Sequence, residues 1–174
     1  TGDACSWSVT YTYVIKDACG NATTATVSYS GGDKTAPALK SGSTLPTGGT
    51  DINSCTAPAG PTAEEVAALF AGKSGGAGPV PESGTPTGDA CSWSVTYTYV
   101  IKDACNNATT ATVTYTGGDV TPPTIGTDNL DRTLTSTNCV FTIPDLTAEV
   151  RAISSDNCTD NASLVVTQSS AGVQ

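Results

Sequence analysis

An internal repeat constrains this sequence more than any other feature. Residues 1–33 recur almost unchanged as residues 87–119, at an offset of 87 − 1 = 86 residues. Of the 33 aligned positions, three differ, namely Gly20/Asn106, Ser28/Thr114 and Ser30/Thr116. Self-similarity at a fixed period is the sequence signature of an array of similar units. The repeat therefore predicts tandem domains rather than one large fold.

A fainter match follows each copy and sets the domain boundaries. The segment 33–37 resembles 119–123, and 62–66 resembles 147–150. We therefore divide the chain into the last two strands of one repeat, one complete repeat and the first part of a third, which are residues 1–33, 34–119 and 120–174. A repeat of this length suits a small β-sandwich domain. The proline-containing joints at 31–37 and 117–123 are expected to be stiff linkers.

The repeated segment has the pattern of a β-hairpin. In residues 6–15 the large apolar side chains alternate with Ser and Thr, which predicts a half-buried strand with Trp7, Val9, Tyr11, Tyr13 and Ile15 inward. Residues 17–21 form a turn, and 23–29 predict a second strand with Ala25, Val27 and Tyr29 inward. The same hairpin is expected at 92–101 and 109–115.

The remainder of each repeat predicts short elements. Thr62 and Glu65 have capping-box spacing before an apolar run, which predicts a helix at 63–71 and a counterpart at 148–153. Further strands are expected near 52–57, 78–83, 132–135, 139–143 and 163–168. Short strands with frequent turns predict an all-β fold, namely tandem immunoglobulin-like antiparallel β-sandwiches with one short helix per repeat.

Composition excludes several classes of function. The chain has no His, 7 Lys and Arg against 16 Asp and Glu, and a net charge of −9, so it would repel nucleic acid and anionic lipid. Its apolar runs are only a few residues long, which argues against membrane insertion. No nucleophile–base pattern, Gly-x-Ser-x-Gly elbow or phosphate loop is present, so we predict that it is not an enzyme. Glu64 and Glu65 are interpreted as first-turn helix charges.

The cysteines indicate disulfides in an exported protein. Cys5 and Cys19 bracket one strand, about 46 Å apart at roughly 3.3 Å per residue, so they cannot pair with each other. In an immunoglobulin-like topology the first cysteines of strands B and F lie close together, which predicts Cys55–Cys91. The other five are expected to be unpaired or bonded outside this segment, unless terminal pieces of neighbouring chains complement each other; they are Cys5, Cys19, Cys105, Cys139 and Cys158. Seven buried free thiols is the alternative.

Calcium is a candidate ligand at the turns and joints. Asp17 and Asp103 precede the cysteine turns, and Asp33 and Asp119 lie at the joints. Several carboxylate oxygens together could bind a hard cation. Alternatively, each Asp caps its own turn through backbone amides. Rows of threonines, such as Thr10 with Thr12, could bind ice or glycan but are also ordinary exposed strand residues.

Several motifs together resemble a known family. They are the Asp-x-Thr-x-Pro joints, Ser-Asp-Asn-Cys at 155–158, and Tyr-Thr-Tyr-x-x-x-Asp-x-Cys-Gly-Asn at 11–21. These motifs resemble the HYR-like, immunoglobulin-like repeats of Bacteroidetes surface adhesins of the gliding-motility type, exported by type IX secretion. The resemblance implies an extracellular, cell-surface location, partners in the export or motility machinery, and no catalytic residues. The middle repeat departs from the pattern because it lacks the Asp-Asn-Cys cysteine and has Asn106 for Gly.

Three roles follow as hypotheses. The first is a structural stalk or fibre that projects an adhesin, with adjacent repeats and other copies as partners. The second is a carbohydrate- or protein-binding module that acts through loops at one end of the sandwich, with 72–86 as the candidate segment. The third is an accessory domain of an exported enzyme.

Overall fold

The structure is a computed structural model, and it describes residues 1–72, 80–82, 84–126, 131, 133–135 and 143–169. Of these described residues, 40% are in strands and 11% in helices, so the structure is β-rich. Contacts group the chain into two units, which we describe separately. Unit 1 comprises 1–48, 59–85 and 95–114, and unit 2 comprises 49–58, 86–94 and 115–174.

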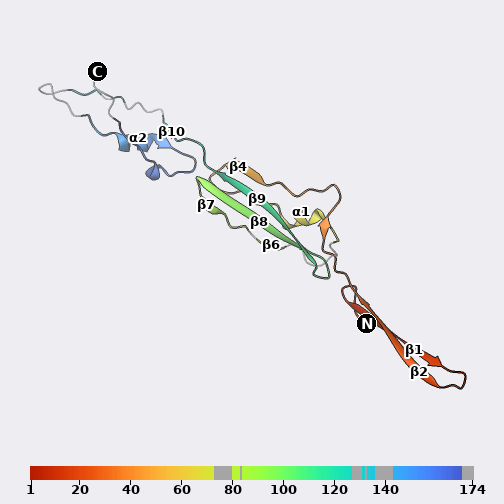
Figure 1. The fold of residues 1–174 in the computed structure, drawn as a ribbon. Helices are drawn as coiled ribbons and strands as arrows, with labels where there is room; N and C mark the ends of the chain where they lie inside the picture. The colour runs from red at the N-terminus through yellow and green to blue at the C-terminus, as the bar shows by residue number, and fades with distance from the viewer. Residues whose placement is uncertain (73–79, 83, 127–130, 132, 136–142, 170–174) are drawn as a thin grey trace. The chain divides into compact units, whose positions relative to one another are not determined.

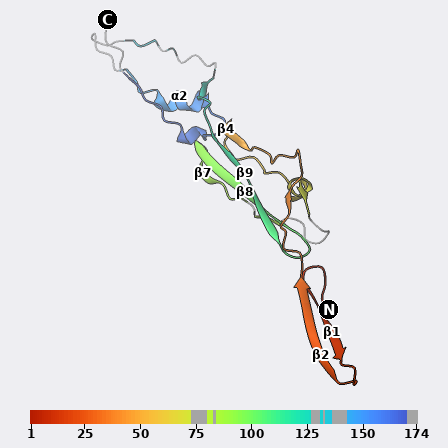
Figure 2. The same ribbon diagram turned by 45° about the vertical axis from the view of Figure 1, so that its right-hand side comes forward.

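Unit 1 begins with a long hairpin. β1 (Trp7–Lys16) pairs with antiparallel β2 (Ala22–Gly31), in a register that sets Tyr11 opposite Val27. Figures 1 and 2 both show the two strands side by side. On the polar face, the hydroxyls of Thr10 and Ser28 are 2.8 Å apart. The alternation of apolar and hydroxyl side chains thus produced the predicted hairpin.

A small strand–helix–strand motif follows in the same unit. β3 (Ala38–Leu39) pairs antiparallel with β5 (Phe70–Ala71), and α1 (Ala63–Ala68) lies between them in the sequence. The predicted capping box is present, because the Glu65 amide donates to Thr62 Oγ1 and the Thr62 amide donates to Glu65 Oε2. These bonds satisfy amides that the first helical turn leaves unpaired. The helix ends earlier than the predicted Ala71, since Phe70 joins β5.

The second copy of the hairpin lies within a sheet. Its strand order is β4, β9, β8 and β6, and β7 also pairs with β8. β4 runs parallel to β9, whereas β6 and β7 run antiparallel to β8. The bounds are β4 (Gly49–Asn53), β6 (Val80–Glu82), β7 (Thr87–Asp89), β8 (Ser92–Lys102) and β9 (Ala108–Gly118). The parallel pair corrects the expectation of a wholly antiparallel fold.

Unit 2 ends with a second strand–helix–strand motif. β10 (Thr124–Ile125) pairs antiparallel with β11 (Ser154–Ser155), and α2 (Thr147–Ile153) precedes β11. The short 3-10 helix η1 (Asn161–Ser163) follows. The order matches β3, α1 and β5, which confirms that the faint sequence match reflects a shared local structure.

The two hairpins have nearly the same sequence and opposite burial. In the second copy, most equivalents of the predicted inward side chains are buried, namely Trp93, Val95, Tyr99, Ile101, Ala111 and Val113, while Tyr97 and Tyr115 are half-buried. In the first copy, every residue of β1 and β2 is exposed. The predicted core face is therefore correct, but only the middle repeat buries it.

Other expectations have mixed outcomes. The strand predicted at 163–168 is wrong, because η1 occupies its start and the rest is irregular. Residues 133–135 contain no strand, and the strand expected at 52–57 is β4, which ends at Asn53. Most of 139–143 lies outside the described residues. The domain boundaries at 34 and 119 stay a prediction.

Three of the four glycines of the expected linkers, Gly31, Gly117 and Gly118, belong to strands. β2 ends at Gly31 and β9 at Gly118. A Cβ on Gly117 would lie 2.5 Å from the Trp93 ring, and one on Gly118 would lie 2.0 Å from the Cys91 carbonyl oxygen. A Cβ on Gly117 would also lie 2.2 Å from the Ile52 carbonyl oxygen of β4. Gly117 and Gly118 are therefore required by the close approach of neighbouring backbone and side chains to β9, and not by a need for linker flexibility.

Candidate functional site at the joints between repeats

The first joint connects the open end of hairpin β1–β2 to the turn between β8 and β9. A disulfide joins Cys5, just before β1, to Cys105, in that turn, with their Cα atoms 5.0 Å apart. The two cysteines are separated by 100 residues and lie in the two copies of the repeated segment, 1–33 and 87–119. The bond therefore links the start of the first hairpin to the turn of the second.

Asn107 adds a polar contact beside this disulfide. Its side-chain Nδ2 donates to the Asp33 carbonyl oxygen at 3.2 Å and to Asp103 Oδ2 at 2.8 Å. Nearby, the Thr109 hydroxyl donates to the Pro37 carbonyl oxygen at 2.5 Å. The linker that follows β2 is thus hydrogen-bonded to the turn and first residues of β9.

Asp103 fixes the shape of the turn. Its Oδ1 accepts the backbone amides of Cys105 at 2.8 Å and Asn107 at 2.9 Å. Burial opposes ionisation of this carboxyl, but the hydrogen bonds from Asn107 and Cys105 outweigh it and lower the Asp103 pKa. Asn106 has a left-handed φ of 63°, and Gly20 has 87° at the equivalent position. Asn tolerates this conformation, which explains why the substitution leaves the turn intact.

The equivalent turn of the first hairpin has the same internal bonds. Asp17 Oδ1 accepts the amides of Cys19 at 3.0 Å and Asn21 at 2.8 Å. The side-chain hydrogen bond from Asn21 is the main cause of the lowered Asp17 pKa. Cys19 is an exposed free thiol, whereas its equivalent, Cys105, is bonded.

The second joint also carries a disulfide. Cys55, which follows β4, is bonded to Cys158, which follows β11, with a Cα–Cα distance of 5.3 Å. The Asn157 side-chain amide donates to Asp119 Oδ1 at 3.2 Å. Each joint therefore combines one disulfide with one asparagine that donates a hydrogen bond to the Asp at the end of a copy of the repeated segment, Asp33 or Asp119.

The segment around this second bond is also tied by local hydrogen bonds. Asp156 Oδ1 accepts the amides of Cys158 at 2.9 Å and Thr159 at 2.7 Å, and the Cys158 amide is the largest contributor to the lowered Asp156 pKa. Asn53 Oδ1 accepts the Val120 amide at 3.1 Å, which holds the linker against the end of β4.

The predicted Cys55–Cys91 disulfide is wrong. Cys55 is bonded to Cys158, and Cys91 is an exposed free thiol. The prediction placed the two strands in facing sheets, but β4 and β8 lie in one sheet with β9 between them. Strands two apart are separated by about 9.6 Å, beyond the roughly 7 Å limit for bridged Cα atoms.

The expected status of the remaining cysteines is corrected in part. Cys5, Cys105 and Cys158 were expected to lack partners within the segment, yet all three are bonded inside it. Cys5 and Cys19 are not bonded to each other, as their separation along one strand predicted. Cys139 lies outside the described residues.

The four calcium candidates act as acceptors for nearby N–H groups. Asp17 and Asp103 cap their turns, Asp33 accepts the Thr35 amide, and Asp119 accepts the Thr121 amide. In the part of the chain that the structure describes, no three His, Cys, Asp or Glu residues gather in a group able to hold a metal. Calcium binding stays a prediction without geometric support.

The comparisons with known proteins found no match. No family model, no curated protein and no solved structure resembles the chain significantly. Among the described residues, no helix has the length and apolar character needed to cross a membrane. The two disulfides indicate an oxidising compartment, either extracellular or periplasmic. Most of the predicted loop-binding segment 72–86 lies outside the described residues or is short strand, so the binding module stays a prediction.

Sequence reasoning missed the disulfides between repeats, although the necessary signal was present. Cys5 and Cys19 lie at opposite ends of one hairpin, and the hairpin recurs. If repeats follow one another head to tail, the open end of one hairpin meets the turn of the next. That arrangement pairs Cys5 with the equivalent of Cys19, which is Cys105.

Proposed function

We propose that this chain is part of the structural stalk or fibre of a large extracellular cell-surface adhesin, built from tandem immunoglobulin-like β-sandwich repeats. The proposed source is an adhesin of the gliding-motility type, exported by the type IX secretion system. The role is mechanical: the repeats project a distal adhesive region and transmit force. Adjacent repeats and the export or motility machinery are the expected partners.

The observation that carries this proposal is the Cys5–Cys105 bond between consecutive repeats. A covalent bond across a joint adds nothing to a pocket or a catalytic site. It does limit how far the joint can separate under load. The overlapping loops closed by Cys5–Cys105 and Cys55–Cys158 span 100 and 103 residues, so most of the chain is shielded from extension.

Single-molecule force spectroscopy tests the mechanical role. The chain is inserted between reference domains and stretched from its ends, with and without a reducing agent. Because of the overlapping loops, we expect reduction to release about 100 further residues, or about 350 Å at roughly 3.3–3.6 Å per residue. Equal full extension in both conditions would mean that the disulfides do not bear load, and the stalk proposal would lose its support.

A further inference from the structure

The two disulfides differ in what surrounds their sulfur atoms. In the second bond, Cys55–Cys158, the Asn157 side-chain Nδ2 lies 2.9 Å from Cys158 Sγ and 3.7 Å from Cys55 Sγ. The Asn157 carbonyl oxygen lies 3.3 Å from Cys55 Sγ. Among the described residues, no such group contacts the sulfurs of the first bond, Cys5–Cys105. One asparagine therefore presents a donor to one sulfur of the second bond and an acceptor to the other.

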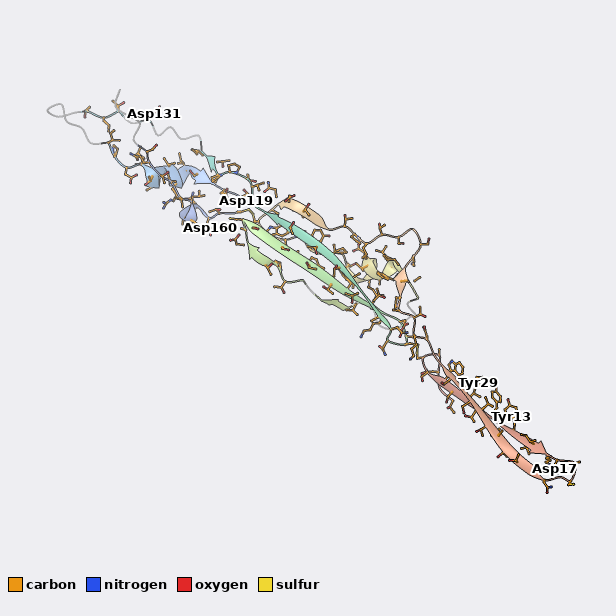
Figure 3. All side chains as sticks on the ribbon, viewed as in Figure 1. Tyr13, Asp17, Tyr29, Asp119, Asp131 and Asp160 are labelled. Carbon is orange, nitrogen blue, oxygen red and sulfur yellow. A yellow bond between two sulfur atoms is a disulfide. The ribbon has the colours of Figure 1, made fainter. Side chains whose placement is uncertain are left out.

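The asparagine beside the first bond has no hydrogen left for sulfur. An asparagine side-chain amide has two N–H hydrogens. Those of Asn107 go to two oxygen acceptors, the Asp33 carbonyl oxygen and Asp103 Oδ2. Within the described ranges, the Asn157 amide donates to one oxygen, Asp119 Oδ1, so its second hydrogen is available to the sulfur. Figure 3 marks Asp119, which follows the end of β9.

Other features of the two bonds are closely matched. Their loops span 100 and 103 residues, so the chain-entropy contribution to each bond is nearly the same. All four bonded cysteines are half-buried, so access by a reagent does not separate the bonds. An aspartate two residues earlier accepts the backbone amide of Cys105 at 2.8 Å and that of Cys158 at 2.9 Å. The contacts of Asn157 with sulfur are therefore the main local difference between the bonds.

Reduction converts these contacts into hydrogen bonds. A thiolate at Cys158 accepts the Asn157 N–H as a charge-assisted hydrogen bond, which is stronger than a bond to a neutral sulfur. The Cys55 thiol gains an S–H hydrogen, which donates to the Asn157 carbonyl oxygen. The Asp119 carboxylate opposes the thiolate, but it also accepts the Thr121 amide at 3.0 Å. Partners of the reduced sulfurs are thus in place before reduction.

We propose that Cys55–Cys158 is a redox-sensitive bond, which a dithiol opens while Cys5–Cys105 stays closed. Reduction separates the segment after β4 from the segment after β11, both within unit 2. Asn157 makes the second bond easier to reduce than the first. This inference goes beyond the stalk role and does not rest on it.

The bond opens by thiol–disulfide exchange with a defined direction. A thiolate of the dithiol attacks Cys55 Sγ, and the Cys158 thiolate leaves, because a stabilised thiolate is the better leaving group. The second thiolate of the dithiol then attacks the reagent sulfur of the mixed disulfide and releases the Cys55 thiolate. The protein disulfide gains two electrons and, once both sulfurs are protonated, two protons. The dithiol loses the same number of each and becomes a cyclic disulfide.

A redox titration of the full-length chain tests the difference between the bonds. The other thiols are removed by Cys19→Ser, Cys91→Ser and Cys139→Ser. The protein is equilibrated in mixtures of reduced and oxidised dithiothreitol, alkylated and digested with trypsin. Each bonded cysteine then lies in its own peptide, and these peptides are 1–16, 41–73, 103–132 and 152–174.

We expect the second bond to be half reduced at a lower ratio of reduced to oxidised dithiothreitol than the first. The expected difference is about tenfold, which corresponds to about 30 mV for a two-electron couple. Equal midpoints, or a first bond that opens more readily than the second, would overturn the proposal.

Two matched variants test the role of Asn157. Asn157→Ala removes the donor to sulfur, so the midpoint of the second bond should shift by about tenfold toward more reduced dithiothreitol. Asn107→Ala should leave the midpoint of the first bond unchanged, because Asn107 donates to oxygen atoms. Asn157→Asp keeps the side-chain shape but replaces the donor with an acceptor, and it should shift the second midpoint at least as far. If neither Asn157 variant shifts the second midpoint, the proposal is wrong.

The direction of attack is tested with a monothiol. Brief treatment of the same full-length chain with reduced glutathione, stopped by acid, traps the mixed disulfide at the attacked sulfur. We expect glutathione on peptide 41–73, which contains Cys55, and a free thiol on peptide 152–174, which contains Cys158. As much glutathione on Cys158 as on Cys55 would contradict stabilisation of the leaving thiolate by Asn157.

Discussion

At the residue scale, one asparagine side chain contacts both sides of the first joint. Asn107 belongs to the turn of one repeat and donates to the Asp33 carbonyl oxygen that ends the previous repeat. It also donates to Asp103 within its own turn. The same residue type in the first hairpin, Asn21, makes the corresponding bond to Asp17. A comparison of Asn107 with Asn21 therefore separates the stability contributed by the hydrogen bond across the joint from the stability contributed by the hydrogen bond within the turn.

Replacing Asn107 with Ala should destabilise the middle repeat more than Asn21→Ala does. Both variants lose the bond to the turn Asp, but only Asn107→Ala loses the bond to the Asp33 carbonyl oxygen, which contributes about 1 kcal/mol. The measurement is urea unfolding followed by Trp93 fluorescence in a Trp7→Phe background. Equal midpoints for the two variants would show that the bond across the joint does not stabilise the fold.

The turn carboxylates predict how stability depends on pH. The Asp103 pKa is lowered in the folded state, so its contribution is fully present above the unfolded pKa of about 3.9. That contribution is lost as the pH falls through the folded value. Between pH 6 and pH 3, we expect the melting temperature of the wild type to fall, and that of Asp103→Asn to start lower and fall less. A larger pH dependence in Asp103→Asn would contradict this sign.

At the scale of elements, nearly the same sequence forms a hairpin in two environments, exposed in β1–β2 and largely buried in β8–β9. The Thr10–Ser28 hydroxyl contact recurs as Thr96–Thr114, which shows the same register in both copies. In the exposed copy, Tyr11 and Tyr29 also form an edge-to-face pair with ring centroids 6.1 Å apart. Local alternation and cross-strand pairs therefore specify the hairpin, and burial adds stability only in the middle repeat.

A comparison of Tyr99 with Tyr13 tests how much burial contributes to the free energy of unfolding. Tyr99→Ala removes a fully buried ring and should destabilise the middle repeat by about 3–5 kcal/mol. Tyr13→Ala removes an exposed ring and should change stability by less than about 0.5 kcal/mol. Thermal unfolding by calorimetry, at a concentration where the wild type is monomeric, measures both. Similar losses for the two variants would mean that hairpin β1–β2 is covered in solution.

At the scale of the whole molecule, disulfides link segments that are far apart in the sequence. Cys5–Cys105 and Cys55–Cys158 close loops that overlap, so neither loop can extend fully while both bonds are intact. Each of these bonds lies beside a hydrogen bond from an asparagine, from Asn107 to Asp33 at the first and from Asn157 to Asp119 at the second.

Removing the first disulfide should have a large effect. The double variant Cys5→Ser with Cys105→Ser loses the constraint on a loop of 100 residues, which contributes up to about 4.7 kcal/mol in the chain-entropy model. Cys19→Ser, which removes an exposed free thiol, should change stability by less than about 0.5 kcal/mol. Chemical unfolding under non-reducing conditions measures both. A double variant as stable as Cys19→Ser would show that the bond is absent or does not constrain the unfolded chain.

The sequence by itself determined the features that depend on local interactions. Hairpin alternation, the Thr62–Glu65 capping box and the Asp-capped cysteine turns follow from side chains a few residues apart. The hairpins and cysteine turns form alike in both copies, whereas the capping box is present at α1 and no side-chain cap bond is present at α2. The cysteine partners and the burial of each hairpin were decided only by the tertiary structure. The pairing of Cys55 depends on β9 lying between β4 and β8. The burial of Tyr99 depends on distant residues such as Pro61, whose carbonyl oxygen accepts the Tyr99 hydroxyl, whereas Tyr13 is half exposed. Such contacts join distant parts of the chain, and no local pattern specifies which distant part will be present.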